Sequence, residues 1–156
     1  MDEFDPLALD NQLCFPLYSA SRAVVRAYKP YLDKIGLTYT QYITMMALWE
    51  HAPLTVNELG ALLYLDSGTL TPLLKKLEQK GLVTRTRSAE DNRRVLVGLT
   101  GQGTALQDQA AAIPHQMERE LSLPREDALE LYRILHEFLG DRPAPGQEPG
   151  CSRQDS

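Results

Sequence analysis

The chain of 156 residues is long enough for one domain with a sizeable core, but short for two. Its longest apolar runs fall short of the roughly 18 residues that a membrane span needs, and its acidic start, MDEFDPLALD, lacks the basic and apolar parts of a signal peptide. We therefore predict a folded cytoplasmic protein that spans no membrane. The net charge of −5 disfavours a polyanionic partner unless the charge is unevenly distributed.

The first predicted helix lies within residues 10–36, where apolar residues recur at helical spacing. Asp10 is a candidate N-cap. Pro16 lacks a backbone N–H, so it either kinks the helix or delays its start. Pro30 is expected to bend the path, and Gly36 to end this region.

The same segment, DNQLCFPLYSASR, contains Cys14, while Cys151 lies at the other end of the chain. Neither has the spacing of a disulfide framework or zinc site, so we expect no metal and no cofactor. A lone cysteine is commonly an inert buried residue, and a reactive one needs a stabilised thiolate. Cys14 has no adjacent Lys, Arg or His, but a tyrosine hydroxyl can donate a hydrogen bond to a thiolate. Tyr18 lies at i+4, on the same helical face.

Two further helices are predicted from capping boxes, in which a Thr is followed three residues later by Gln or Glu. Thr38 and Gln41 open one helix in TYTQYITMMALWEH. Thr55 and Glu58 open a short one in TVNELGALLYL, which is expected to end at about Tyr64.

An amphipathic helix follows in DSGTLTPLLKKLEQKG, with Leu at i, i+3, i+4 and i+7 and Gly81 as the stop. We expect it to begin near Thr69, which would put Pro72 in the first turn, where proline is tolerated. Its other face and its N-terminal end form a candidate binding surface that includes hydroxyl and basic side chains. The residues of this surface are Ser67, Gly68, Thr69, Thr71, Pro72, Lys75, Lys76 and Gln79.

The hydrophobic period then changes to two, which predicts strands over 82–87 and 95–99 joined by the loop SAEDNRR. The basic candidates are Arg85 and Arg87 on the first strand and Arg93 and Arg94 at the hairpin tip. Asp91 either orients one of these arginines or caps the turn. Residues 67–94, the basic segment, carry a net charge of +4, which leaves −9 on the rest of the chain.

Residues 104–140 are expected to be helical with a break at SLPRED, and the Pro/Gly-rich residues 141–156 to form a disordered tail. The order helix, turn, amphipathic helix and hairpin describes a winged helix-turn-helix. Such a helix can enter the major groove of DNA, and a hairpin arginine the minor groove. We therefore predict a double-stranded DNA partner.

Residues 54–100, with Asp91-Asn92-Arg93 as a D-x-R wing motif, resemble the MarR family of bacterial winged-helix repressors. The stretches LDNQLCFPLYSASR and YKPYLDKIGLTYTQYITMMALWEH resemble its OhrR branch, the organic-hydroperoxide sensors. The resemblance implies a single, mainly α domain with a small β-hairpin wing. It places the winged helix-turn-helix at about 38–100 and the N- and C-terminal dimerisation helices at about 10–36 and 104–140. A homodimer implies a pseudo-palindromic operator with half-sites about 10 bp apart.

The resemblance also assigns roles around Cys14. Tyr28 and Tyr39 match the pair that hydrogen-bonds the reactive cysteine across the dimer interface, since Tyr28 lies too far along the helix to reach the sulfur of its own chain. An organic hydroperoxide, the inducer, is expected to oxidise Cys14 to a sulfenic acid and release the operator. A mixed disulfide with a small thiol is then expected, with Cys151 as the alternative resolving thiol. An apolar setting of Leu13, Phe15, Met45 and Met46 would favour apolar peroxides.

Two other interpretations stay open from the residues alone. The protein is either a repressor released by a small phenolic ligand, or a thiol peroxidase that uses Cys14. The peroxidase would need a cationic neighbour for the thiolate, and the three histidines, His51, His115 and His136, stand in no local motif. We therefore expect a regulator rather than an enzyme.

Overall fold

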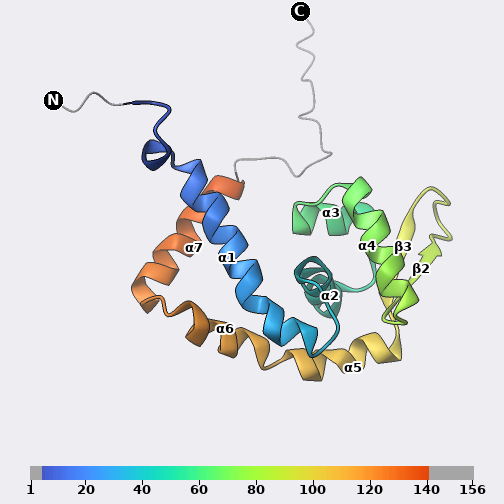
Figure 1. Cartoon of the computed structure of the whole chain (residues 1–156). Helices are drawn as coiled ribbons and strands as arrows, with labels where there is room; N and C mark the ends of the chain where they lie inside the picture. The colour runs from blue at the N-terminus through green and yellow to red at the C-terminus, as the bar shows by residue number, and fades with distance from the viewer. Residues whose placement is uncertain (1–4, 141–156) are drawn as a thin grey trace, which may run out of the picture.

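The computed structural model describes residues 5–140 of the chain (Figure 1). A short 3-10 turn, η1 (Leu9–Asn11), precedes the first helix, α1 (Cys14–Asp33). The N-cap of α1 is Leu13, which makes no side-chain cap bond, so the expectation that Asp10 caps this helix is wrong. Pro16 is the third residue of α1, in the first turn, where a backbone N–H has no acceptor within the helix. Its position fits the expected late start of the helix rather than a kink.

Both predicted capping boxes are confirmed. In α2 (Tyr39–His51) the Thr38 side chain accepts from the Gln41 N–H and the Gln41 side chain accepts from the Thr38 N–H. Thr55 and Glu58 exchange the same pair of bonds at the start of α3 (Val56–Leu63). That helix ends at Tyr64, which adopts the left-handed conformation with φ 53°.

The amphipathic helix, α4 (Ser67–Gln79), begins two residues earlier than expected because Asp66 is its N-cap and accepts a 2.9 Å bond from the Thr69 N–H. Pro72 therefore lies inside the helix and not in its first turn, so the predicted start near Thr69 is wrong. The predicted leucine stripe is confirmed: all four members are buried, namely Leu70, Leu73, Leu74 and Leu77.

The predicted hairpin is present as β2 (Val83–Arg87) and β3 (Val95–Leu99). A third strand, β1 (Leu54–Thr55), pairs with the other side of β3 and gives an antiparallel sheet of order β1-β3-β2. Sequence analysis missed β1 because two residues are too short for an alternating pattern.

The C-terminal region forms three helices, α5 (Gly101–Ala110), α6 (Ile113–Leu121) and α7 (Arg125–Gly140). The helix starts before residue 104 because Thr100 caps it by accepting from the Gly103 N–H at 2.9 Å. The break at SLPRED is confirmed, with Ser122 left-handed at φ 48°, and a second break separates α5 from α6. The predicted tail, 141–156, lies outside the described residues.

The core lies where α2, α4 and the sheet meet, and α5 and α6 extend it toward the end of α1 (Figure 1). Met45 is completely buried in this core, so it does not line the surroundings of Cys14 as expected from the sequence. Leu13, Phe15 and Met46 are all exposed. No helix among the described residues is long and apolar enough to cross a membrane.

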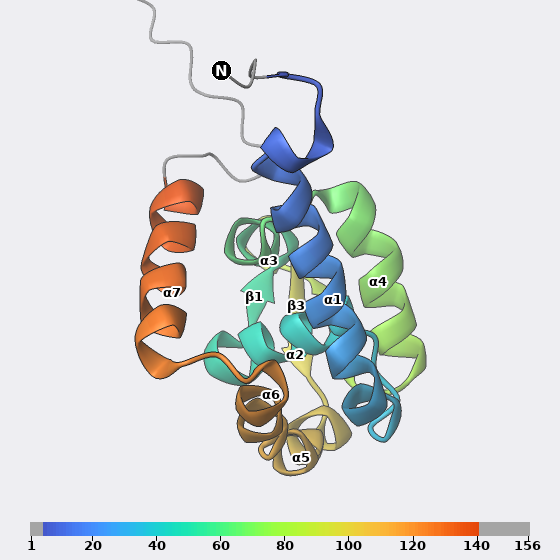
Figure 2. The ribbon, with the colours of Figure 1, turned by 60° about the vertical axis from the view of Figure 1, so that its left-hand side comes forward.

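Two helices, α1 and α7, which we call the terminal helices, leave apolar side chains uncovered. None of the residues of α7 is buried. In Figure 2, α7 stands apart from α1 and from the winged-helix part. The exposed apolar side chains of the two helices are Phe15, Leu17, Tyr18, Val25, Leu129, Leu131, Tyr132, Ile134 and Phe138. Within residues 5–140, the other elements of the chain leave these side chains exposed.

The contact between α5 and the α4–β2 turn yields a stability prediction. A Cβ at Gly103 would lie 2.0 Å from the Leu82 carbonyl oxygen, and the Gly103 carbonyl accepts a 2.9 Å bond from Trp49 Nε1. We expect Gly103→Ala to lower the free energy of unfolding by about 2–4 kcal/mol, since backbone atoms would have to move. Gly101→Ala is the control, because its Cβ would have no neighbour within 4 Å. Urea unfolding followed by circular dichroism measures both, and equal effects would contradict the prediction.

Candidate functional site

The outer face of α4 is a continuous exposed surface opposite the leucine stripe. All eight residues proposed for this face are exposed: Ser67, Gly68, Thr69, Thr71, Pro72, Lys75, Lys76 and Gln79. The hydroxyls at its N-terminal end are held locally, with Thr71 donating to the Ser67 carbonyl at 2.8 Å and Thr69 to the Asp66 carboxylate at 3.1 Å. Hydrogen bonds from Thr69 lower the pKa of Asp66, so a negative charge caps the helix and offsets part of its positive end.

The arginines of the hairpin fall into two groups. Arg87 and Arg93 are exposed. Arg85 turns back instead, with its Nη2 and Nε donating to Glu78 Oε2 at 2.7 and 3.0 Å. This partly buried ion pair braces β2 against α4, so the Arg85 guanidinium is already engaged within the protein.

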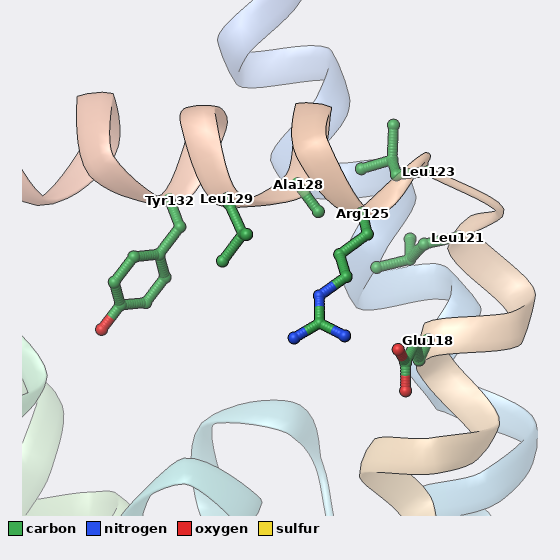
Figure 3. Close-up of a pocket in the computed structure, with 7 residues that line it drawn as sticks. All are labelled: Glu118, Leu121, Leu123, Arg125, Ala128, Leu129 and Tyr132. Atoms are coloured by element: carbon green, nitrogen blue, oxygen red, sulfur yellow. The ribbon is translucent and has the colours of Figure 1, made fainter.

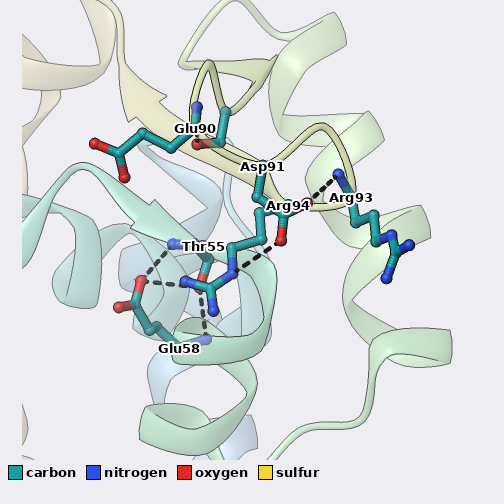
Figure 4. Close-up of polar contacts among 7 residues, drawn as sticks. Thr55, Glu58, Glu90, Asp91, Arg93 and Arg94 are labelled. Carbon is teal, nitrogen blue, oxygen red and sulfur yellow. Dashed lines mark hydrogen bonds and ion pairs between the residues drawn. The ribbon is translucent and has the colours of Figure 1, made fainter.

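Asp91 both caps the hairpin turn and faces an arginine, so both interpretations of this residue describe real contacts. Its Oδ1 accepts from the Arg93 N–H at 3.0 Å, and its Oδ2 lies 3.8 Å from Arg94 Nε. In Figure 4 the Arg93 side chain points away from the carboxylate, whereas Arg94 reaches across it toward the start of α3.

Arg94 brings the wing close to the capping box of α3, a contact that sequence analysis missed. Glu58 Oε2 accepts from the N–H and hydroxyl of Thr55 at 2.7 and 2.9 Å (Figure 4). The bonds from Thr55, and to a smaller extent the positive charge of Arg94, lower the pKa of Glu58. A cavity of about 190 Å³ lies beside this contact, lined by Thr55, Val56, Asn57, Thr71, Arg93, Arg94 and Val95. The wing, α3 and α4 thus converge on one basic surface.

Cys14 is exposed and is the first residue of α1. The N-cap beside it is Leu13 and not Asp10, the residue expected from the sequence. Tyr18 is on the same helix and 58% exposed, and its hydroxyl accepts a 3.4 Å bond from Arg22. The guanidinium of Arg22 also lies 5.5 Å from the Tyr18 ring centre. Arg22 therefore places a cation on α1 one turn after Tyr18.

Tyr28 and Tyr39 come together where α1 meets α2, with ring centres 5.0 Å apart. Tyr42, which sequence analysis missed, completes this tyrosine cluster at 5.8 Å from Tyr28 and is only 2% exposed. The spacing of three residues between Tyr39 and Tyr42, which puts both on one face of α2, is the sequence signal that could have identified Tyr42. Cys14 lies fourteen residues before Tyr28 on one helix, about 21 Å along its axis at 1.5 Å per residue. The cluster therefore does not reach the cysteine of its own chain.

Burial raises the pKa of all three phenols in the cluster above 10.0, a value at which a tyrosine is already protonated at neutral pH. Desolvation raises the pKa of Tyr28 and of Tyr39, and it raises the pKa of Tyr42 to about 12, with the neighbouring phenols adding to the effect. At neutral pH these hydroxyls are therefore hydrogen-bond donors, the form that can stabilise an anion.

A concavity of about 460 Å³ lies at the elbow between α6 and α7. Figure 3 shows its leucine wall, with Arg125 and Glu118 toward one end and Tyr132 toward the other. It continues the uncovered apolar surface of α7. Of the histidines, His136 stacks on Tyr132 at 4.0 Å and His51 lies beside Glu50. The described residues contain no cluster of His, Cys, Asp and Glu that could hold a metal.

The comparisons with known proteins agree with this geometry. Residues 26–110 match the family described as transcriptional regulator SarA/Rot. The chain is 49% identical to the organic hydroperoxide resistance transcriptional regulator of Bacillus subtilis strain 168, over 88% of this chain and 94% of that protein. Its fold is similar to that of reduced AbfR bound to DNA, with a TM-score of 0.72, 37% identity and coverage of 85% and 92%. For MarR of E. coli the TM-score is 0.67, with 27% identity and coverage of 82% and 97%.

The pKa of Tyr42 predicts a pH dependence of stability. The folded protein holds this phenol proton more tightly than the unfolded chain, whose tyrosines titrate near 10.0. The resulting stabilisation is fully present below about pH 10 and is lost as the pH rises toward about 12. We expect the wild type to lose more stability than Tyr42→Phe between about pH 9 and pH 12 in urea unfolding. Parallel losses in the two proteins would contradict this assignment.

Proposed function

The chain belongs to the MarR family of winged-helix transcriptional regulators, in its organic-hydroperoxide-sensing branch, and on that premise we propose that it is a repressor that leaves its operator when Cys14 is oxidised. The observation that carries the proposal is the exposed basic face of α4 beside the wing, in a chain whose described part also holds the exposed Cys14 and a cluster of three tyrosines. As a DNA-binding regulator it acts in the cytoplasm.

The proposed DNA interface uses the outer face of α4 in the major groove. Lys75 and Lys76 suit contacts to phosphates, and the hydroxyls of Thr69 and Thr71 suit the base edges or phosphates near the helix start. Arg93, whose side chain is exposed and points away from Asp91, is placed to enter the minor groove (Figure 4). Arg94 is assigned to holding the wing, because it faces Asp91 and the start of α3.

A homodimer accounts for the uncovered terminal helices. The exposed apolar side chains of α1 and α7, and the leucine wall of the α6–α7 elbow, form a surface that a second copy can bury. We propose that the regions near 10–36 and 104–140 serve dimerisation and that 38–100 binds DNA. Two-fold symmetry then matches a pseudo-palindromic operator.

The proposed sensor is completed by the second subunit, whose Tyr28 and Tyr39 hydroxyls would donate to the Cys14 thiolate. The thiolate attacks one oxygen of an organic hydroperoxide; the S–O bond forms as the O–O bond breaks, and the alkoxide leaves and takes up a proton to become an alcohol. Sulfur loses two electrons and becomes a sulfenic acid. This product then forms a mixed disulfide with a small thiol and releases water. The alternative resolving thiol, Cys151, lies outside the described residues.

Oxidation changes the group that the tyrosines bind, and it shifts the dimer toward an arrangement in which the two α4 helices no longer match the operator. The oxidised cysteine is a stoichiometric switch in this scheme rather than a turnover intermediate, in keeping with the transcriptional regulators to which the chain is similar.

Replacing the cysteine tests the redox step. We expect cumene hydroperoxide with a small thiol to weaken operator binding of the wild type at least tenfold and to leave Cys14→Ser unaffected, because serine does not form the sulfenic acid. Operator DNA in a gel-shift titration provides the measurement. Cys151→Ser is the matched control and should respond as the wild type does. Peroxide-induced release of Cys14→Ser would instead favour a ligand-controlled repressor.

The two tip arginines are predicted to differ in salt dependence. Arg93→Gln should weaken operator binding about 5- to 30-fold and reduce the slope of log K against log salt by about one, because a cation is withdrawn from the DNA. Arg94→Gln removes the same charge but should leave the slope near that of the wild type, with a smaller loss of affinity. Fluorescence anisotropy at several salt concentrations compares them, and equal changes of slope would remove Arg94 from its assigned role.

A further inference from the structure

Lys80, which follows the last residue of α4, is exposed like Lys75 and Lys76, but its ammonium is held by acceptors of another segment. Lys75 and Lys76 are exposed on the outer face. The Lys80 ammonium instead donates to the Gly36 carbonyl and, at 3.0 Å, to Gln41 Oε1. One lysine of the basic segment thus has two of its three N–H donors engaged within the protein.

The two acceptors of Lys80 belong to the connection between α1 and α2. Gly36, left-handed at φ +69°, turns the chain after α1. Gln41 is 4% exposed, and the same Oε1 atom accepts the Thr38 N–H at 3.2 Å in the capping box of α2. One ammonium group therefore joins the end of α4 to the end of α1 and the beginning of α2.

The tyrosine cluster rests on this same connection. Tyr39 and Tyr42 flank Gln41 in the first turn of α2, and both pack on Tyr28 of α1. A displacement of these rings would therefore move the first turn of α2, which carries Gln41, the residue whose side-chain oxygen accepts from Lys80.

The remaining contacts near this end of α4 are less directional. Its leucines pack into the core through apolar surface, which tolerates small sliding movements better than a hydrogen bond does. A cavity of about 390 Å³ borders Gly36, Lys80 and α5, so close packing does not fix the α1–α2 connection on that side.

We propose that Lys80 is a positioning residue that transmits the state of the tyrosine cluster to α4. The inference rests on the proposed redox function and adds the path by which a change at the tyrosines reaches the DNA-binding helix. Hydrogen bonds from the ammonium make α4 move with the α1–α2 connection. Without them the oxidised protein keeps α4 in its operator-binding position.

The test measures the ratio of operator dissociation constants between the protein oxidised with cumene hydroperoxide and a small thiol and the reduced protein. Lys80→Met, which keeps the length of the side chain but loses its donors, should reduce this ratio at least fivefold relative to the wild type. Lys80→Arg should restore most of it. Lys34→Met is the control, because it removes a lysine of the same connection whose ammonium lies 5.8 Å from the Tyr31 ring centre and should leave the ratio unchanged.

A purely structural role would lower the melting temperature and weaken both redox states together, leaving the ratio at its wild-type value and overturning the inference. If peroxide releases the wild type from the operator and Lys80→Met shows the same ratio of dissociation constants as the wild type, this inference alone is overturned. A wild type that peroxide does not release overturns the proposed function and this inference with it.

Hydrogen exchange of the wild-type protein gives an answer that does not depend on the folding of a variant. Oxidation should change the protection of amides 38–42 and of amides 76–80 together, because Lys80 joins the two segments. A change confined to 38–42 would overturn the proposal.

Discussion

The burial of a single leucine stripe on α4 determines what the rest of that helix can do. Leu70, Leu73, Leu74 and Leu77 face the core, so hydroxyls and lysines are forced to the opposite side. The sheet and α3 then set the orientation of this exposed face. The wing lies beside α4 because Arg85 pairs with Glu78, and it approaches α3 because Arg94 faces Asp91 and Glu58. Presentation of a basic surface is thus a consequence of core packing.

Charge count alone does not describe that surface. Of the basic side chains in residues 67–94, three are turned to intramolecular acceptors: Lys80, Arg85 and Arg94. Lys80 and Arg94 are nevertheless exposed, as are Lys75, Lys76, Arg87 and Arg93, so only Arg85 is partly buried. A cation held by a carboxylate or carbonyl brings less net charge to a phosphate, but it fixes the framework on which the exposed cations are carried. The basic segment therefore supplies both a binding surface and its scaffold.

Local signals predicted the fold well where a few neighbouring residues decide the outcome. The Thr38 and Thr55 capping boxes and the leucine period of α4 are such cases. Two missed features have no local pattern of their own, namely the pairing of β1 with β3 and the break between α5 and α6. The early start of α4, which puts Pro72 inside the helix, depends on the Asp66 N-cap, a local signal that was overlooked. At the candidate site, Cys14 and Tyr18 stay predictions from the residues, and Tyr28 and Tyr39 stay predictions from the family resemblance. The packing of Tyr42 on Tyr28 and the bonds made by Arg85 and Lys80 depend on tertiary contacts that no local pattern shows.

The length of α1 explains why the proposed sensor uses two chains. Cys14 and Tyr28 lie on one continuous helix, so their separation of about 21 Å is fixed by the helical rise. In a two-fold contact, residue i of one helix meets residue j of its partner, and j meets i. An antiparallel α1 pair with its axis near Ser21 would thus place each Cys14 opposite the partner subunit's Tyr28. Any change at the sulfur would then act on the angle between subunits, and so on the spacing of the two α4 helices.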